Sequence, residues 1–202
     1  MELVKKVLRG DIRSIAKAIS LVENDQPGKE KFIDAIYPYC GKAVIWGVTG
    51  PPGAGKSTLV DKLLEKELEK GRKVAVIAVD PSSPFTGGAV LGDRLRMQSH
   101  ATNPNVFIRS MASRGHLGGV AGATTDAVRV LDAAGYDLII IESIGVGQTE
   151  IEIIEIADIV LLVLVPGDPV DVVLGESAHA ADREAMRSAM GLDRPLGERW
   201  LQ

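Results

Sequence analysis

The clearest chemical signal in the chain is a glycine-rich segment, GPPGAGKS at residues 50–57, which matches the phosphate-loop pattern G-x-x-x-x-G-K-[ST]. Its glycines let successive backbone N–H groups point inward at phosphate oxygens. Lys56 then supplies a positive charge for the β- and γ-phosphates during phosphoryl transfer, and the hydroxyl of Ser57 is a ligand for Mg²⁺. The residues predicted to contact a nucleotide are Gly53, Ala54, Gly55, Lys56, Ser57 and Thr58.

Acidic residues at strand ends are the candidates for completing a magnesium site. Asp80 and Glu142 each follow a short apolar run. Carboxylate oxygens suit Mg²⁺, which keeps several waters and takes few protein ligands. Asp93 lies in a glycine-flanked segment, where it either faces the nucleotide or caps the next helix. These three carboxylates and Ser57 form the predicted metal site. The alternative interpretation of Asp80 and Glu142 is that they are ordinary polar residues at the ends of strands.

The segment after Glu142 contains further candidates for the reaction. The backbone N–H of Gly145, three residues beyond Glu142, can contact a γ-phosphate and so distinguish a triphosphate from a diphosphate. Gln148 either orients an attacking water or is a solvated surface residue. One of four arginines is a candidate for stabilising the charge of the transition state. The alternative is that each of them is a solvated or ion-paired surface residue. The arginines in question are Arg94, Arg96, Arg109 and Arg114.

The apolar pattern predicts the elements that position these residues. Short apolar runs predict strands, and amphipathic stretches between them predict helices. The expected strands are 43–48, 74–79, 106–108, 138–141 and 159–165, and the expected helices include 59–68 and 123–134. Continuous apolar strands that alternate with helices predict a mostly parallel sheet covered on both faces, with ligands at the carboxyl ends of the strands. The predicted fold class is an α/β P-loop NTPase with an N-terminal helical arm.

Three parts of the chain differ in pattern. Residues 1–41 carry apolar residues at helical spacing and a turn at 23–28, which predicts a helical arm packed against the main domain. Residues 42–167 carry the alternating strands and helices of the predicted P-loop domain. Residues 168–202 form a divergent, less apolar tail, in which one helix is expected at 177–190, with its end marked by Gly191.

Composition narrows the class of protein. The net charge of −4 and the eight aromatic residues argue against a surface that grips nucleic acid. The single cysteine, Cys40, excludes an internal disulfide, and the histidines His100, His116 and His179 lack metal-ligand spacing. The longest strongly apolar run, 159–165, is far shorter than the roughly 20 residues of a membrane-spanning helix. We therefore expect a cytoplasmic protein that binds neither nucleic acid nor membranes.

Five segments together resemble one family: GVTGPPGAGKSTLVDKL, IAVDPSSPFTGGAVLGDRLRM, FIRSMASRGHLGG, DLIIIESIGVGQTE and VLLVLVPG. They are similar to the P-loop GTPases that chaperone methylmalonyl-CoA mutase, also labelled ArgK-type or lysine/arginine/ornithine transport ATPases or kinases. The resemblance implies a cytosolic homodimeric GTPase that binds GTP or GDP with Mg²⁺ and guards cobalamin loading of an acyl-CoA mutase. By position, it assigns Lys56 and Ser57 to nucleotide and metal, and Asp80, Asp93 and Glu142 to the metal.

The chain departs from this family after residue 167. The family continues with an N-K-x-D motif that reads guanine, but the last lysine here is Lys73, so no such motif follows the phosphate loop. We expect a chain that is truncated or altered after residue 167 and that selects GTP over ATP only weakly. Two alternatives stay open: an ATP-dependent small-molecule or protein kinase, and a non-catalytic fragment that binds a nucleotide or a partner.

Overall fold

The structure of the chain, a computed structural model, describes residues 2–51, 53–81, 100, 102–113, 119–143, 153–164 and 179–189. The chain divides into two compact units, Met1–Leu164 and Val165–Gln202. In the second unit the described residues form one helix, α8 Ala180–Ala189, inside the predicted segment 177–190. None of the helices among the described residues combines the length and the apolar character needed to cross a membrane.

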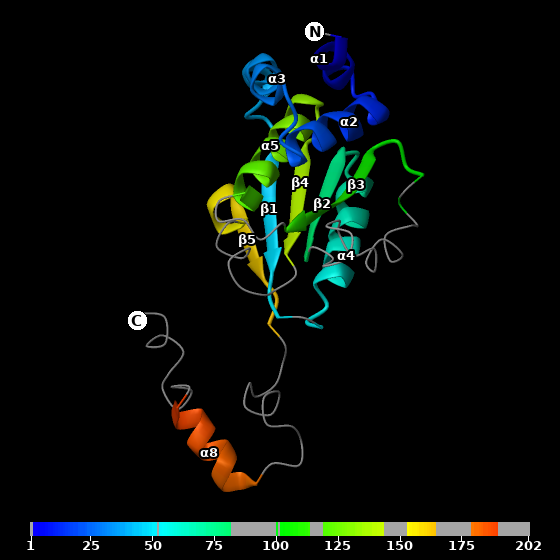
Figure 1. The fold of residues 1–202 in the computed structure, drawn as a ribbon. Coiled ribbons are helices and arrows are strands. Elements are labelled where there is room, and N and C mark those ends of the chain that lie inside the picture. The colour runs from blue at the N-terminus through cyan, green and yellow to red at the C-terminus, as the bar shows by residue number, and fades with distance from the viewer. Residues whose placement is uncertain are drawn as a thin grey trace. The chain divides into compact units, whose positions relative to one another are not determined.

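A five-stranded sheet forms the centre of the first unit (Figure 1). The strands lie in the order β3-β2-β4-β1-β5, and every pairing among the described strands is parallel. Their bounds are β1 Val44–Thr49, β2 Val74–Pro81, β3 Val106–Ser113, β4 Leu138–Ser143 and β5 Ile159–Leu162. Because the strands are parallel, their carboxyl ends meet at one edge of the sheet, with those of β1, β2 and β4 side by side.

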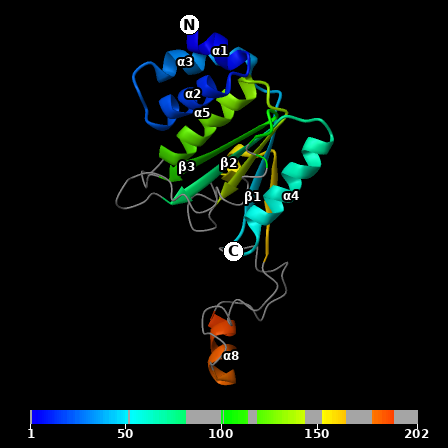
Figure 2. The same cartoon turned by 90° about the vertical axis from the view of Figure 1, so that its right-hand side faces the viewer.

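Helices cover both faces of this sheet, which explains why its central strands are apolar up to their carboxyl ends. All six residues of β4 are buried, as are residues 74–79 of β2. Helix α4, Lys56–Glu69, packs on one face through buried residues such as Leu64. Helix α5, Gly119–Ala133, lies on the opposite face together with the N-terminal helices (Figure 2). The sheet is therefore the middle layer of three.

Three elements differ from the sequence-based expectation. Strand β3 continues past the expected residue 108 to Ser113, because the charged Arg109 that interrupts its apolar run finds an ion partner. Strand β5 is not covered on both faces: Ile159 and Leu162 are 46% and 47% exposed, because β5 is the outermost described strand on its side. Helix α5 begins at Gly119, four residues before the expected start, in a stretch whose glycines have low helix propensity.

The N-terminal arm consists of four short helical elements. These are α1 Glu2–Leu8, α2 Ile12–Glu23, α3 Lys29–Ile36 and the 3₁₀ helix η1 Tyr37–Tyr39. Their apolar side chains join the core cluster on the α5 face of the sheet. The carboxylate of Asp11 caps α2 by accepting a hydrogen bond from the Ser14 backbone N–H at 2.8 Å, and hydrogen bonding to Ser14 lowers the pKa of Asp11. The arm thus packs as part of the first unit.

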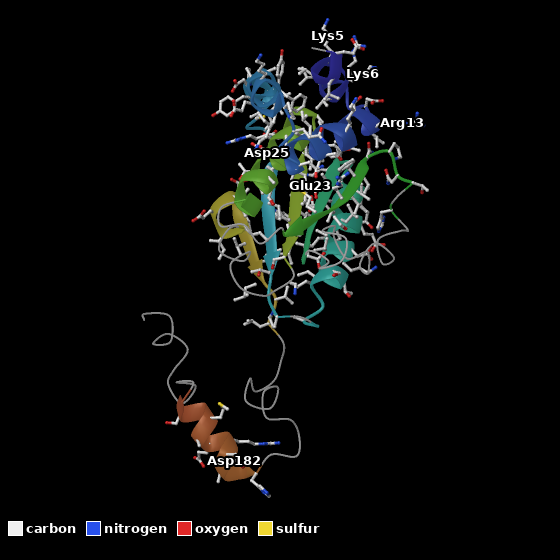
Figure 3. The ribbon with its side chains drawn as sticks, viewed as in Figure 1. Lys5, Lys6, Arg13, Glu23, Asp25 and Asp182 are labelled. Atoms are coloured by element: carbon white, nitrogen blue, oxygen red, sulfur yellow. The ribbon has the colours of Figure 1, made fainter. Side chains whose placement is uncertain are left out.

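An ion pair joins the arm to the sheet. The guanidinium of Arg109 on β3 lies 2.7 Å from the Glu23 carboxylate at the end of α2, and it donates a hydrogen bond to Ser20 Oγ at 3.0 Å. Figure 3 shows Glu23 where the arm meets the sheet, and Lys5 and Lys6 at the outer end of the arm. Arg109 is therefore engaged by the arm, which supports the ion-paired alternative over a role in stabilising transition-state charge.

Asp132 of α5 fixes the segment that leads into β1. Its buried carboxylate accepts hydrogen bonds from the backbone N–H groups of Gly41, Lys42 and Ala43, the last two at 3.1 and 3.0 Å. We expect Asp132→Ala to lower the free energy of unfolding by about 2–4 kcal/mol, because three donors lose a charged acceptor at once. Asp132→Asn keeps one acceptor oxygen and should lose less. Urea unfolding measures both variants, and equal losses would contradict this account.

Candidate phosphate-binding site

The loop between β1 and α4 depends on three glycines with positive φ angles. Gly50, Gly53 and Gly55 have φ values of 138°, 78° and 86°, a region that side chains with a Cβ rarely adopt. Gly50 also has no room for a side chain, because an added Cβ would lie 2.1 Å from the carbonyl oxygen of Val163. Gly55 directly precedes α4, so the loop ends at the positive end of that helix. This geometry suits an anion such as phosphate.

Lys56, the first residue of α4, folds back along the loop. Its side chain is buried, and its Nζ donates hydrogen bonds to the carbonyl oxygens of Gly50 at 2.7 Å and Pro51 at 3.0 Å. The ammonium group therefore lies at the start of the loop, although the residue stands at its end. The two carbonyls carry partial negative charges, and a phosphate oxygen would offer this ammonium group a full negative charge.

Ser57 and Glu142 meet at the other end of the loop. The hydroxyl of Ser57 donates a hydrogen bond to Oε1 of Glu142 at 2.5 Å, and both residues are buried. The sheet register pairs Glu142 of β4 with Val48 of β1, two residues before Gly50, which brings the carboxylate to the loop. A shielded hydroxyl and a carboxylate are oxygen ligands of the kind that Mg²⁺ takes in proteins. The residues present therefore fit the metal expected from the sequence.

Two hydroxyl residues that the sequence analysis did not single out lie beside this pair. Thr49 ends β1 and Ser143 ends β4, and their hydroxyl oxygens are 2.8 Å apart in a buried contact. The sequence offers one sign of their importance, which is that each residue is next to a predicted site residue. Thr49 directly precedes Gly50, and Ser143 directly follows Glu142. Pairing residues 94 positions apart, however, requires knowing that β1 and β4 are neighbours.

The other predicted site residues divide into two groups. Thr58 is exposed on the first turn of α4, and Gly53 and Ala54 lie in the loop itself. The backbone of Asp80 lies at the carboxyl end of β2, one residue beyond Val79, whose register partner is Ser143 of β4. Six candidates fall outside the described residues: Asp93, Arg94, Arg96, Arg114, Gly145 and Gln148.

The histidines and the cysteine form no metal site in the described parts of the chain, where no group of three metal-ligating side chains occurs. His100 Nε2 lies 3.4 Å from the carboxylate of Asp61 on α4, and His179 is exposed in the second unit. The thiol of Cys40 lies 3.4 Å from the carbonyl oxygen of Arg129, and burial raises its pKa. Cys40 is thus a partly buried packing residue, with its thiol protonated near neutral pH.

A parallel α/β sheet whose glycine loop leads into a helix, beside a buried lysine and a serine–carboxylate pair, defines the class of P-loop NTPases. A solved structure described as a LAO/AO transport system kinase shares this fold with a TM-score of 0.65 and 30% sequence identity. The match covers 96% of this chain and 64% of that one. The predicted fold class is therefore confirmed.

Within this class the chain belongs to the MeaB family, the methylmalonyl-CoA mutase-associated GTPases, whose profile matches residues 15–175. A protein of Pyrococcus abyssi is 58% identical over 166 residues, and GTPase ArgK of Escherichia coli is 42% identical over 170 residues. Each alignment covers 82% of this chain and 51% of the relative. The family predicted from the five sequence segments is thus confirmed, and the chain spans about half the length of these curated relatives.

Proposed function

We propose that this chain binds GTP together with Mg²⁺ and hydrolyses it to GDP and phosphate. The observation that carries the proposal is the buried Lys56 inside a glycine loop, with the Ser57–Glu142 contact at the end of that loop. At the carboxyl edge of a parallel sheet these residues provide one cation for the phosphates and two oxygen ligands for the Mg²⁺ that a bound triphosphate requires. Membership of a GTPase family supports guanine as the base.

Each residue of the loop has a role in the proposed reaction. The backbone N–H groups of Gly53, Ala54 and Gly55 and the start of α4 hold the phosphates, and Thr58 adds a contact. Lys56 leaves the carbonyls of the loop and faces the β- and γ-phosphates. The remaining roles belong to the metal: Ser57, Asp80, Asp93 and Glu142 are its proposed ligands. When bound, Mg²⁺ neutralises the charge that develops on the phosphoryl oxygens.

Gly145 and Gln148, which follow β4 in the sequence, have the last two roles in the proposed reaction. We assign the backbone N–H of Gly145 to a contact with the γ-phosphate, which exists only in the triphosphate state. We assign the side chain of Gln148 to orienting the attacking water, a role that glutamine fills in other P-loop enzymes. Catalysis by such a site rests on positioning and on fixed charges rather than on a covalent step.

The proposed partner is a cobalamin-dependent acyl-CoA mutase, for which the chain would act as a chaperone of cobalamin loading or protection. The description of the family names methylmalonyl-CoA mutase, and a relative from Caenorhabditis briggsae, 38% identical over 179 residues, is named methylmalonic aciduria type A homolog. We further propose a cytoplasmic homodimer, with the arm at 1–41, the P-loop domain at 42–167 and the tail at 168–202.

Calorimetry with GTP, GDP, ATP and ADP, each with Mg²⁺ and with EDTA, tests binding, and phosphate release from GTP tests hydrolysis. We expect Mg²⁺-dependent binding of GTP and release of phosphate. Transfer of phosphate from ATP to an added small molecule or protein would instead indicate a kinase. A chain that binds none of the four nucleotides would contradict the proposal and indicate a fragment that binds only a partner.

We predict weak selectivity of this 202-residue chain for GTP over ATP, below about tenfold, or ~1.4 kcal/mol. A site that hydrogen-bonds a base strongly rejects another base because its buried polar groups are left unpaired. The chain has no N-K-x-D motif to supply such groups after the phosphate loop. Competition of GTP, ATP and inorganic triphosphate against a fluorescent guanine nucleotide measures the selectivity. A preference for GTP of a hundredfold or more would show that other residues read the base.

A further inference from the structure

A buried pair of hydroxyl groups holds the entrance of the phosphate loop to the neighbouring strand. Thr49 and Ser143 are 4% and 1% exposed, and their hydroxyl oxygens lie 2.8 Å apart. A buried hydroxyl without a hydrogen-bond partner destabilises a folded protein. The contact between Thr49 and Ser143 gives each hydroxyl such a partner. The contact joins the last residues of β1 and β4, the two strands whose ends carry the loop and Glu142.

Thr49 also connects the loop to a third strand end. Its carbonyl oxygen accepts a hydrogen bond from the backbone N–H of Val163 at 2.8 Å, just beyond β5. The next residue, Gly50, lies so close to the carbonyl oxygen of Val163 that any Cβ would clash with it. The position of Thr49 is therefore set by its backbone on one side and by its hydroxyl on the other.

The loop is thus tied to the end of β4 at two points. At its exit Ser57 contacts Glu142, and at its entrance Thr49 contacts Ser143, the residue next to Glu142. The two contacts differ in what a ligand does to them. Ser57 and Glu142 are the proposed metal ligands, so their direct hydrogen bond changes when a metal binds. Thr49 and Ser143 are not among the proposed metal ligands, so their contact can persist through binding and reaction.

We propose that Thr49 and Ser143 form a positioning pair that keeps the end of β4 in place against the phosphate loop. The inference rests on the proposed GTP hydrolysis. Its consequence is that the pair controls the rate of hydrolysis more than the affinity for nucleotide. The loop backbone and Lys56 hold a nucleotide whether or not the pair exists, whereas the reaction also needs Glu142 at a fixed place relative to them.

The test compares GTP hydrolysis and GDP affinity in the parent chain and in Thr49→Val, Thr49→Ser, Ser143→Ala and the Thr49→Val/Ser143→Ala double variant. Thr49→Val keeps the shape and removes the hydroxyl, and it should lower kcat about tenfold with a change in the Kd for GDP below about twofold. Thr49→Ser keeps the hydroxyl and should retain most of kcat. The double variant should be no slower than the slower single variant, because the two hydroxyls act as one unit.

Thr124→Val provides the matched control. Thr124 on α5 is equally buried, but its hydroxyl makes no hydrogen bond to any described residue. Thr124→Val should therefore keep the parent kcat, whatever it does to the melting temperature. If Thr49→Val and Ser143→Ala change only the melting temperature, or if their losses of kcat simply multiply in the double variant, the positioning role is wrong.

A second readout separates this inference from the proposed function. In the nucleotide-free chain, Ser143→Ala should speed hydrogen exchange of the backbone amides of Gly50 and of residues 53–57, although Ser143 is not part of the loop. Thr124→Val should leave their exchange unchanged. A parent chain without GTPase activity would refute the proposed function, and the exchange rates would then still decide whether the pair positions the loop. Unchanged exchange in Ser143→Ala would overturn the inference.

Discussion

Lys56→Ala should weaken binding of GTP by about 100-fold, or ~2.7 kcal/mol. The buried ammonium is the one side-chain cation that the structure places inside the loop, among the residues it describes. Its removal leaves the backbone N–H groups in place but takes away the charge for the β- and γ-phosphates. Titration with a fluorescent GTP analogue, with inorganic triphosphate as competitor, measures the loss. The loss for GDP should be smaller, because GDP lacks the γ-phosphate.

Two further variants identify the cause of such a loss. Lys56→Gln keeps a hydrogen-bond donor on a side chain one bond shorter but has no charge, so it should bind GTP nearly as weakly as Lys56→Ala. Lys62→Ala removes an exposed lysine of the same helix, paired with Glu65 at 2.7 Å, and should bind like the parent. Parent-like affinity in Lys56→Ala would show that the segment is not a phosphate loop.

The loop itself was predictable because its sequence specifies its backbone locally. Gly50, Gly53 and Gly55 occupy positions with positive φ, and α4 begins at the lysine and serine of the motif, directly before the apolar stretch 59–68 that predicted the helix. The strands next to it were predictable for a related reason. A run such as the Leu138–Ile141 segment, with four apolar residues in succession, suits a strand buried on both faces, and β4 is buried throughout.

Contacts between distant parts of the chain were not predictable from local pattern. Arg109 was considered for transition-state charge, but its partner is Glu23, 86 residues earlier. The same limit applies to Asp132, which holds the segment before β1, and to the Thr49–Ser143 pair. In each case the residue types are ordinary, and the function of the side chain follows from the strand order and from the packing of the arm.

The proposed metal ligands were predictable in part. Glu142 was predicted from its place after an apolar run, and the β1–β4 register brings it to Ser57. Asp80 follows a similar run, and the register of β2 with β4 places its backbone at the same edge of the sheet. The position of these residues at one edge of the sheet could therefore be predicted once the parallel order of the strands is inferred, and their role as metal ligands stays a prediction.

Glu142→Gln should reduce the rate of GTP hydrolysis by about 100-fold, with a change in GDP affinity below about threefold. The amide has nearly the shape of the carboxylate and can still accept the hydrogen bond from Ser57, but it carries no negative charge for a divalent cation. The concentration of Mg²⁺ for half-maximal activity should therefore rise. Phosphate release measured across a Mg²⁺ titration reports both effects.

Glu67→Gln is the matched control for this change, because Glu67 is a second buried glutamate with a different task. Its carboxylate binds Lys70 at 2.6 Å and Arg72 at 2.9 Å at the far end of α4 from Ser57. Glu67→Gln should lower the melting temperature, since two ion pairs lose their anion, and leave the Mg²⁺ titration as in the parent. An unchanged Mg²⁺ titration in Glu142→Gln as well would mean that Glu142 only ends its strand and that the metal, if bound, takes other ligands.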